Sequence, residues 1–358
     1  MLVLLFFPFY LHAQEEKEKI TDEIVSAVRH TGRQIRHKVK DFNAIDTNYI
    51  SPNLYNLAFM LEQSTWYEHY QLGNNAGSQS QRLNFSPTLG TKLGIYFGWR
   101  WIFLGYTFDV EDLFGDNKNK PKKKEMSLNI YSSKFGVDLY YRKTGSDVKF
   151  RTHEGFGMQN VPSFEGSDFD GLSSKLFGVN ASWIFNHKKY SQQASFRHNT
   201  IQLRNAGSFI ANLSYTRQTI AFDYEKLPTE MNVYLHNSLM FGKLKYSNYS
   251  LGFGYGYNWV LSKTWLASIS LLPSISYKVT ELPDIDFTSS GHDLSDENQS
   301  KNPSFDFITR ASVVYNTGKY FAGAMLVFNA YNNRKSDLCV SHSFGTLRIY
   351  AGLNFWKK

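Results

Sequence analysis

The feature that most constrains the fold is a strict two-residue alternation from Tyr249 to Lys278. Up to Trp259, bulky apolar residues alternate with serine, glycine and asparagine, and the alternation restarts at Trp265 after a short break near Ser262. A period of two over about ten residues is typical of a β-strand with one apolar and one polar face. The stretch therefore predicts two long strands joined by a tight turn.

The two faces of these strands indicate what surrounds them. The polar face consists largely of glycine and serine, which suit a crowded or wet interior, whereas the other face carries bulky aromatic residues at its ends. Aromatic girdles at both ends of an apolar face are typical of strands that cross a membrane. The sequence therefore predicts an all-β fold, a transmembrane antiparallel up-and-down β-barrel. A soluble double-sheet sandwich is the alternative, since periodicity does not show what covers the apolar face.

The composition agrees with a barrel. Aromatic residues make up 16% of the chain, with 23 Tyr and 29 Phe, which suits a sheet protein with aromatic belts. No apolar run approaches the roughly 20 residues that a membrane helix needs. A mean hydropathy of −0.39 is compatible with a membrane barrel, because alternate residues of each strand face the lumen.

The N-terminal residues differ from the rest of the chain and define the expected domain boundaries. Residues 1–14, MLVLLFFPFYLHAQ, form a short hydrophobic region with a small residue, Ala13, at a cleavage-like position. We interpret residues 1–13 as a signal peptide, with a buried N-terminal strand as the alternative. Apolar residues at near-helical spacing predict a periplasmic helical lead-in over 14–45, and the barrel domain is expected over 46–358. The expected location is the cell outer membrane.

Turn lengths give the expected number of strands. Further strands are predicted over 190–198 and 233–241, and Pro87 should mark a bulge, an edge or a turn. Tight turns are expected near Gly98, Ser132, Lys188, Ser262 and Thr317, and long loops at 112–124, 143–173, 280–303 and 332–344. Short periplasmic turns and long outer loops are typical of membrane barrels. This arrangement predicts about 14 strands, with 12 as the alternative, and both termini in the periplasm.

Several stretches resemble a known family. They are DTNYI at 46–50, GIYFGWRWIFLGY at 94–106, SSKFGVDLYYR at 132–142 and AGSF at 206–209. From about Asp46 to its end the chain resembles domain-of-unknown-function family 4421, a family of exported proteins from the Bacteroidota. The resemblance implies an outer-membrane barrel-like fold and no established activity. The final Gly352–Trp356 also resembles the aromatic-ended last strand read by barrel-insertion machinery, although here two lysines follow it.

The net charge of +8 raises the question of partners. The basic residues are spread along the chain, with one dense run from Lys118 to Lys124, and no nucleic-acid motif accompanies them. Nucleic acid is therefore not expected. On an exported barrel, surface cations are expected to meet lipid phosphates, with solvated loop residues as the alternative for most of them. The expected partners are outer-membrane lipid, including lipopolysaccharide, and the barrel-insertion machinery, while the sequence does not identify a substrate.

Candidate chemistry is sparse. His236 and Ser238 would share a strand face, as a Ser-His hydrolase needs, but that face points into the lumen, where membrane lipid would have to reach them, and ordinary polar lumen residues are the simpler interpretation. The neighbours Ser341, His342 and Ser343 would point to opposite faces of their strand. The ten histidines lack ligand spacing, and the acidic stretch 281–297 lacks the pattern of a calcium loop. The sequence therefore predicts no catalytic residue, no metal and no cofactor.

Two groups of residues stand out as candidate sites. Four charged residues lie on the polar face of their predicted strands, where they would pair across the lumen or line a pore: Asp138, Arg142, Asp306 and Arg310. Trp99, Arg100 and Trp101 at a tight turn predict an interfacial anchor, with a binding site as the alternative.

These observations predict a non-enzymatic, porin-like outer-membrane barrel that acts in envelope structure or in the passage of small solutes. One alternative is a membrane-embedded lipid-modifying hydrolase, and another is a surface barrel whose long loops bind a glycan or a partner. A channel requires an open lumen, and a hydrolase requires a Ser-His contact near about 3 Å at the barrel mouth or facing lipid. A binding role requires ordered loops.

Overall fold

The computed structural model describes residues 44–52, 54–74, 80–99, 102–110, 124–144, 148–156, 164–196, 200–281, 299–335 and 337–357. The chain divides into two units, residues 1–44 and 45–358, and the second contains every element described below. The expected signal peptide and helical lead-in lie outside the described residues, as do Arg100 and Trp101 and most of the loops predicted at 112–124 and 280–303.

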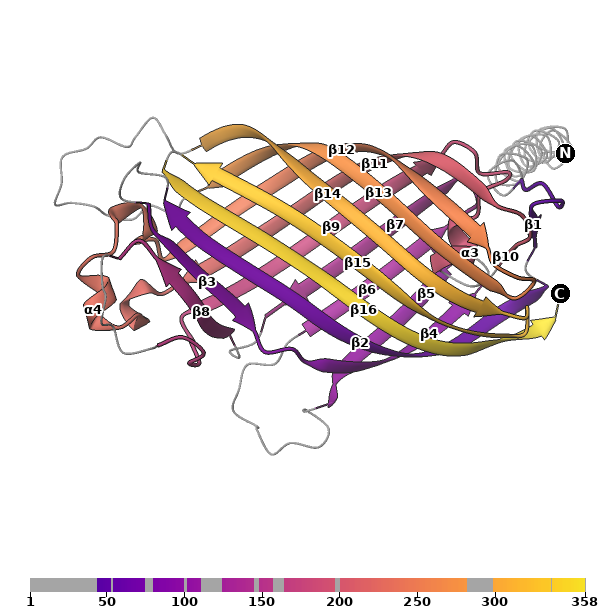
Figure 1. The fold of residues 1–358 in the computed structure, drawn as a ribbon, viewed down its shortest axis with the longest axis horizontal. Coiled ribbons are helices and arrows are strands. Elements are labelled where there is room, and N and C mark those ends of the chain that lie inside the picture. Colours follow the sequence, from indigo (N-terminus) through magenta and orange to yellow (C-terminus); the bar gives the residue numbers. More distant parts are fainter. Residues whose placement is uncertain are drawn as a thin grey trace, which may run out of the picture. The chain divides into compact units, whose positions relative to one another are not determined.

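The second unit is built around one antiparallel sheet of 14 strands, the number expected from the sequence (Figure 1). The strands are β2 (Tyr55–Asn74), β3 (Arg82–Pro87), β4 (Thr91–Trp99), β5 (Ile102–Asp109), β6 (Lys124–Tyr131), β7 (Phe135–Lys143), β8 (Val148–Glu154), β9 (Leu172–Ile184), β11 (Ala206–Phe222), β12 (Lys243–Val260), β13 (Trp265–Glu281), β14 (Gln299–Asn316), β15 (Tyr320–Lys335) and β16 (Leu338–Lys357). The all-β antiparallel barrel is therefore confirmed.

The sheet closes because its last long strand pairs with its first. β16 pairs with β2 from Leu338 opposite Asn74 to Lys357 opposite Tyr55. Twelve strands form the closed ring, and the other two, β3 and β8, branch from it. On its second edge, β2 pairs with β4 over residues 57–65 and with β3 over residues 70–73. The branch therefore extends the wall beyond the ends of the short strands β4 to β6.

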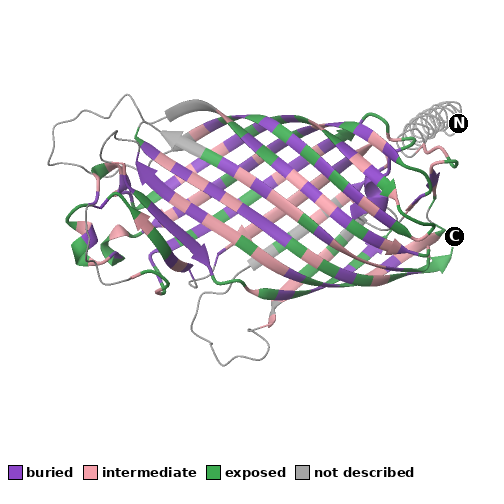
Figure 2. Cartoon of the chain, viewed as in Figure 1, coloured by how far each residue is buried: buried purple, intermediate pink, exposed green. Residues whose placement is uncertain are grey.

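Alternate residues of the ring face the lumen and the exterior (Figure 2). In β4, every second residue is buried and the residues between them are exposed. The inward positions of β12 and β13 are mainly glycine, serine and asparagine, whereas Leu251, Phe253 and Ile275 are all more than half exposed. Small residues are needed inside, because a side-chain carbon added at Gly105 would lie 1.9 Å from the ring of Tyr96. The barrel is thus polar inside and apolar outside.

The exposed apolar side chains form a belt around the ring. On β12 the belt runs from Tyr249 to Trp259, ten residue steps, which at about 3.4 Å per residue and a tilt of about 40° corresponds to about 26 Å along the barrel axis. Aromatic residues mark its edges, with Trp259 and Trp265 at one end and Tyr249 and Tyr277 at the other. A band about 25 Å tall between two aromatic girdles is the surface of a membrane barrel.

Tight turns gather at one end of the barrel, which we call the turn end; the opposite end is the loop end (Figure 1). Tight turns join β6 to β7, β12 to β13 and β14 to β15, as predicted, and two residues separate the end of β4 from the start of β5. In the last of these, Gly318 adopts a φ of 90° and donates its N–H to Asn316 Oδ1 at 2.7 Å. Among the described residues, no helix is long and apolar enough to span a bilayer.

Two predicted strands are wrong. Residues 190–198 contain the helix α3 (Gln192–Phe196), which lies between β9 and the short β10 (Ile201–Gln202), itself paired with β1 (Ile50–Ser51). The turn near Lys188 therefore leads into the lumen and not into the next wall strand. Residues 233–241 follow η2 (Tyr224–Lys226) and α4 (Thr229–Asn232) and contain η3 (Asn237–Leu239). The apolar residues Leu235 and Leu239 are four apart, the spacing of one helical turn.

Two predicted loops also need correction. The long loop predicted at 332–344 is absent, because β15 and β16 run through this region and are joined at residues 336–337. The segment from Asn332 to Asp337 is polar, but backbone pairing does not require apolar side chains, so strands continue through it. The loop predicted at 143–173 contains β8. Pro87 ends β3, as expected for a residue that cannot donate to the ladder.

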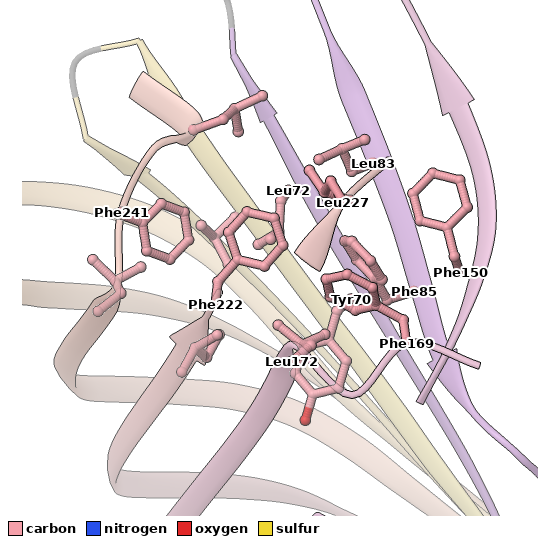
Figure 3. Close-up of a cluster of buried hydrophobic side chains, with 14 of the residues drawn as sticks. Tyr70, Leu72, Leu83, Phe85, Phe150, Phe169, Leu172, Phe222, Leu227 and Phe241 are labelled. Atoms are coloured by element: carbon pink, nitrogen blue, oxygen red, sulfur yellow. The ribbon is translucent and has the colours of Figure 1, made fainter. Parts of the chain in front are cut away.

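A hydrophobic cluster, which we call the cap, packs at the loop end (Figure 3). It joins residues of β2, β3, β8, β9, β11 and β16 to residues of the 227–241 segment. The ring centroid of Phe85 lies 5.0 Å from that of Phe169, 5.4 Å from that of Phe150 and 5.8 Å from that of Phe222. Since β2 and β16 lie across the ring from β9 and β11, the cap reaches across the lumen.

Replacing Phe85 with alanine should destabilise the barrel by about 3–5 kcal/mol, because it leaves a cavity among packed rings. The measurement is denaturant unfolding of the purified barrel in detergent, followed by tryptophan fluorescence. The matched control is Phe305→Ala, since the Phe305 ring is 79% exposed and its removal creates no cavity. Equal losses for the two variants would contradict the role assigned to the cap.

Candidate functional site in the barrel lumen

Helix α3 enters the lumen at the turn end and all five of its residues are buried. Phe196, at its C-terminal end, packs against residues of the surrounding wall, namely Met60, Tyr96, Phe321, Met325 and Tyr350. A five-residue helix is too short to be stable alone. Its position is therefore set by contacts with the wall, and we call α3 together with residues 200–202 the plug.

The plug is held by two polar side chains. Asn258 of β12 donates to the Ser191 carbonyl and to Gln202 Oε1, both at 3.0 Å, and accepts a hydrogen bond from Ser195 Oγ at 2.7 Å. Gln202 accepts from the Ser191 N–H at 2.9 Å and donates to the backbone carbonyl of Lys189 at 2.6 Å. Because Asn258 is fully buried, each of these bonds satisfies a group that has no access to water.

Above the plug lies a chamber of about 100 Å³, lined from both sides of the ring. Its charged and amide side chains are Asp138, Arg142, Asn180, Arg310, Asn329 and Arg348. Its apolar and sulfur-containing side chains include Phe196, Met325, Val327 and Phe344. The plug therefore supplies part of the chamber through Phe196. Three guanidinium groups and one carboxylate, that of Asp138, lie among the described residues of the lining.

Arg142 is held between wall strands by aromatic rings. Its guanidinium carbon lies 3.5 Å from the ring centroid of Trp66 and 4.5 Å from that of Phe344. Its Nη2 donates to Thr346 Oγ1 at 3.4 Å. Cation–π contacts gain strength as water is excluded, and Arg142 is half-buried. The guanidinium is thus fixed in orientation by two rings from β2 and β16.

The other two arginines of the chamber each face a carboxylate. Arg310 Nη2 lies 3.3 Å from Asp138 Oδ2, an ion pair that crosses the lumen from β14 to β7. Arg348 Nε lies 3.7 Å from Glu62 Oε1. Tyr131 donates to Asp138, and Tyr96 donates to Glu62 at 3.2 Å. The first of these ion pairs bridges the lumen, whereas the second joins the neighbouring strands β16 and β2.

Asp306 also lies inside the barrel but is engaged elsewhere. Its carboxylate lies 2.9 Å from Lys278 Nζ and accepts from Asn248 Nδ2 at 3.1 Å and from Ser276 Oγ. Both members of the ion pair are almost wholly buried, with side-chain exposures of 4% for Lys278 and 1% for Asp306. Since each charge has a close partner, this pair has the features of a structural ion pair.

Between the chamber and the cap, a polar layer crosses the lumen. His342 Nε2 lies 3.1 Å from Glu68 Oε1, and His342 Nδ1 lies 3.2 Å from the amide of Gln218 on β11. The ring of Tyr70 stacks on His342 at 4.4 Å, and its hydroxyl donates to Glu68 at 2.8 Å. Since β16 and β11 lie across the ring from each other, this layer also obstructs the lumen.

The structure thus brings together three of the four lumen charges named from the sequence, Asp138, Arg142 and Arg310, and places Asp306 in a separate pair. Sequence reasoning missed Arg348 and Glu62. Both lie at inward-facing positions of their strands, so the two-residue alternation of β2 and β16 was the sequence signal that could have identified them. Trp99, from the expected interfacial anchor, ends β4 at the turn end and is 56% exposed.

His236 and Ser238 do meet, but in a different setting from the one expected. They lie at the loop end in the turn that contains η3, and not on a strand facing the lumen. His236 Nδ1 lies 2.9 Å from Ser238 Oγ and accepts the Ser238 backbone N–H at 3.3 Å. A side chain that receives a backbone N–H at the start of a helical turn is an N-cap. This N-cap interaction accounts for the His236–Ser238 contact without a catalytic role.

Comparison with known families decides the membership of the chain. The model of the family described as "Domain of unknown function (DUF4421)" matches residues 44–355. The chain belongs to this family. The match covers the described barrel except the last two residues of β16, so the plug and the chamber lie within the DUF4421 region. A comparison with curated proteins gave no match.

Solved structures with a similar arrangement are distant. The outer membrane protease OmpT from Escherichia coli is 7% identical, with 84% of this chain and 97% of that chain covered and a TM-score of 0.37. The β domain of the Bordetella autotransporter BrkA is 11% identical, with coverages of 83% and 100% and a TM-score of 0.38. The toluene transporter TodX of P. putida is 7% identical, with coverages of 85% and 91% and a TM-score of 0.28. Likenesses at this level say nothing about activity.

The chemistry available to this DUF4421 barrel follows from its lining. The described residues contain no group of three or more histidine, cysteine, aspartate or glutamate side chains placed to hold a metal ion. Among the described residues that line the chamber there is no serine, cysteine or histidine to act as nucleophile or base. The chamber offers guanidinium donors beside apolar surface.

Replacing Asp306 with asparagine should destabilise the barrel by about 3–5 kcal/mol, because it leaves the Lys278 ammonium buried beside a neutral amide. Denaturant unfolding in detergent measures the loss. The matched control is Asp168→Asn, which removes the exposed pair between Lys149 and Asp168 and should change stability by less than about 1 kcal/mol. A loss at Asp306 no larger than that of the control would show that the buried pair is dispensable.

Proposed function

We propose that this protein is an integral outer-membrane β-barrel with an obstructed lumen, which acts in the cell envelope by holding or passing a small solute under control of the plug. The observation that supports this proposal is the inverted distribution of side chains, apolar on the outside of a closed ring and polar within it. The distribution distinguishes the protein from a soluble sandwich, whose apolar faces would be enclosed.

The outer surface supports the membrane location. A soluble monomer rarely exposes an apolar patch larger than a few hundred Å². Here exposed leucine, isoleucine, phenylalanine, tyrosine and tryptophan side chains recur on the wall strands all around the ring. Lipid covers such a surface without requiring a partner protein. Outer-membrane lipid, with lipopolysaccharide in the outer leaflet, is therefore the proposed surrounding of the belt.

The ends of the barrel support an orientation. In membrane barrels the short turns face the periplasm and the longer connections face outward. By this rule the turn end is periplasmic, and β16 finishes there with Phe355 and Trp356. The plug then enters from the periplasm, and the cap faces the exterior. We further propose that residues 1–13 direct export and that barrel-insertion machinery recognises β16.

The lumen favours controlled over free passage. Three features cross or fill the interior: the ion pair between Arg310 and Asp138, the contact between His342 and Gln218, and the plug. A freely permeable porin keeps an aqueous channel along its axis. Passage through this barrel would require the plug and the charged side chains to move. The hydrolase alternative receives less support, since the contact between His236 and Ser238 is a helix N-cap interaction.

A charge introduced on the belt tests the membrane location. Leu251→Arg should destabilise the barrel in lipid vesicles by about 2–4 kcal/mol, because Leu251 is 67% exposed near the middle of the belt and a cation there must enter the hydrocarbon. The control is Val233→Arg, at a loop-end position that is 74% exposed, where a change within about 0.5 kcal/mol is expected. Equal effects of the two substitutions, measured by unfolding in vesicles, would contradict a lipid-facing belt.

Planar-bilayer conductance tests the plug. The wild-type protein should show heat modifiability on gels but no steady conductance, whereas Asn258→Ala removes three hydrogen bonds that hold the plug and should raise the frequency of open events. The control is Asn212→Ala, which also removes three hydrogen bonds, but to the wall residues Ala181, Ser182 and Ser214. Steady conductance of the wild type would show that the plug does not block the lumen.

A further inference from the structure

The turn end carries an unbalanced positive charge. Six cations there are exposed and form no ion pair with any described carboxylate, and we call them the basic rim: Lys188, Lys189, Arg204, Lys263, Lys319 and Lys357. Among the described residues at this end, Asp46 carries the one side-chain carboxylate, which accepts the Asn48 N–H at 3.0 Å. We propose that the basic rim binds the anionic headgroups of phospholipids in the leaflet at the turn end. The inference rests on the proposed membrane location, because it names the lipid that this end of the barrel selects.

Cations at the loop end are arranged differently. Three of them lie beside carboxylates, in the pairs Arg82–Glu154 at 3.4 Å, Lys149–Asp168 at 3.2 Å and Lys226–Asp170 at 3.2 Å. At the turn end, burial and the Lys134 and Lys188 ammonium groups lower the pKa of His187, which lies in the turn between β9 and α3. A nearby like charge disfavours the protonated imidazole, so these lysines create a positive field at this turn. The turn end thus leaves its charge to an anionic partner.

The short turns hold the rim at the depth of lipid headgroups. Lys263 lies in the four residues that join β12 to β13, and Lys319 lies in the three that join β14 to β15. A chain that reverses within four residues extends at most about 7 Å beyond the strand ends. The headgroup layer is about 5–8 Å thick on each side of the hydrocarbon. Because Trp259 and Trp265 mark the edge of the belt beside the first turn, its lysine reaches the level of the lipid phosphates.

Exposed apolar side chains accompany the cations. Within two residues of a rim cation lie Leu203, Leu261 and Trp356, with exposed fractions of 45%, 64% and 71%. A soluble acidic partner would meet the charges but leave these apolar groups in water. At a lipid interface the apolar groups contact acyl chains while the cations extend to the phosphates. The mixture of side chains therefore favours lipid over a soluble anion.

Lysines at the loop end provide a matched control, because they lie farther from the hydrocarbon. On β12, Lys243 precedes Tyr249 at the edge of the belt by six residue steps, which correspond to about 16 Å along the barrel axis. Lys149 lies on the branch strand β8, and Lys226 lies in η2 between β11 and β12. A distance of about 16 Å exceeds the thickness of the headgroup layer.

Tryptophan fluorescence reports selectively on the turn end. Five of the seven tryptophans lie there and are at least 40% exposed: Trp99, Trp183, Trp259, Trp265 and Trp356. Bromine atoms on a lipid acyl chain quench a tryptophan that the lipid contacts. Quenching by two brominated lipids, each in competition with an unbrominated lipid, therefore gives their relative affinity for this end of the barrel.

The probes are brominated phosphatidylglycerol, which is anionic, and brominated phosphatidylcholine, which is zwitterionic. Each is diluted into phosphatidylcholine vesicles that contain the refolded full-length protein. At an ionic strength of about 0.01 M, where the Debye length is about 30 Å, we expect a preference for phosphatidylglycerol of about threefold to fivefold. At about 1 M salt, where the Debye length is about 3 Å, the ratio should fall to about one. Equal quenching by the two lipids at the lower ionic strength overturns the proposal.

Two variants that lose the same formal charge locate the preference. The turn-end variant should lose at least about half of the preference for phosphatidylglycerol, and the loop-end variant should keep the wild-type ratio. The substitutions are Lys188→Gln, Lys263→Gln and Lys319→Gln in the first and Lys149→Gln, Lys226→Gln and Lys243→Gln in the second. An equal decrease in both variants would show a response to net charge alone and overturn the site. If the turn-end variant fails to fold, Lys263→Gln alone takes its place.

Two further measurements separate the sources of error. Soluble glycerol phosphate should reduce the preference no more than sodium chloride of equal ionic strength, and a larger reduction would assign the rim to a soluble anion. Each protein is also run unboiled and boiled on a gel. Quenching without a lipid preference in a heat-modifiable protein overturns the headgroup site and leaves the barrel standing. Absence of quenching by either lipid, together with no gel shift, overturns the membrane location itself.

Discussion

The pairing of β16 with β2 is the interaction on which the rest of the structure depends. It runs almost the full length of both strands and converts an open sheet into a ring. Only a closed ring satisfies every backbone group of the wall from within the sheet, which is what a strand-built protein must achieve in lipid. Closure also separates an inside from an outside, so the two-residue alternation of each strand becomes a division between lumen and belt. The branch of β3 and β8 is possible because β2 is longer than β4 and has an unused edge beyond it.

Ring size explains why the lumen contains a plug and a chamber. Eight strands enclose a space that side chains fill, whereas 16 to 18 strands leave an aqueous channel. The twelve strands of this ring lie between those limits, so wall side chains alone reach across at some levels and leave space at others. The cap fills the loop end with apolar groups, the plug fills the turn end with a folded-in segment, and the chamber is the space between the two. Its charges lie in surroundings of low dielectric, where paired groups are held firmly.

The sequence was sufficient for the wall but not for what lies inside it. Alternation over 249–278 defines β12 and β13, and inward parity identifies Asp138, Arg142 and Arg310. Helix α3 could not be found in this way, because it has only five residues and buries polar and apolar ones alike, so no helical period separates two faces. Nor could parity show that Trp66 and Phe344 meet at Arg142, since those contacts depend on the register of β2, β7 and β16. Polar residues of β15 near Asn332 read as a loop, because strand pairing beyond the belt leaves no apolar pattern in the sequence.

Movement of the plug and the shape of the chamber are coupled, because Phe196 belongs to both. Its ring packs against Met60 and Tyr96 as part of the plug and lines the chamber beside Met325. Any displacement of α3 that opens the turn end must therefore also remove the part of the chamber lining that Phe196 supplies. A ligand that contacts Phe196 would bind the closed state better than the open one. By linkage it would stabilise the closed plug by the difference between its two binding free energies. Loss of such a ligand and opening of the lumen would in this way be coupled through one side chain.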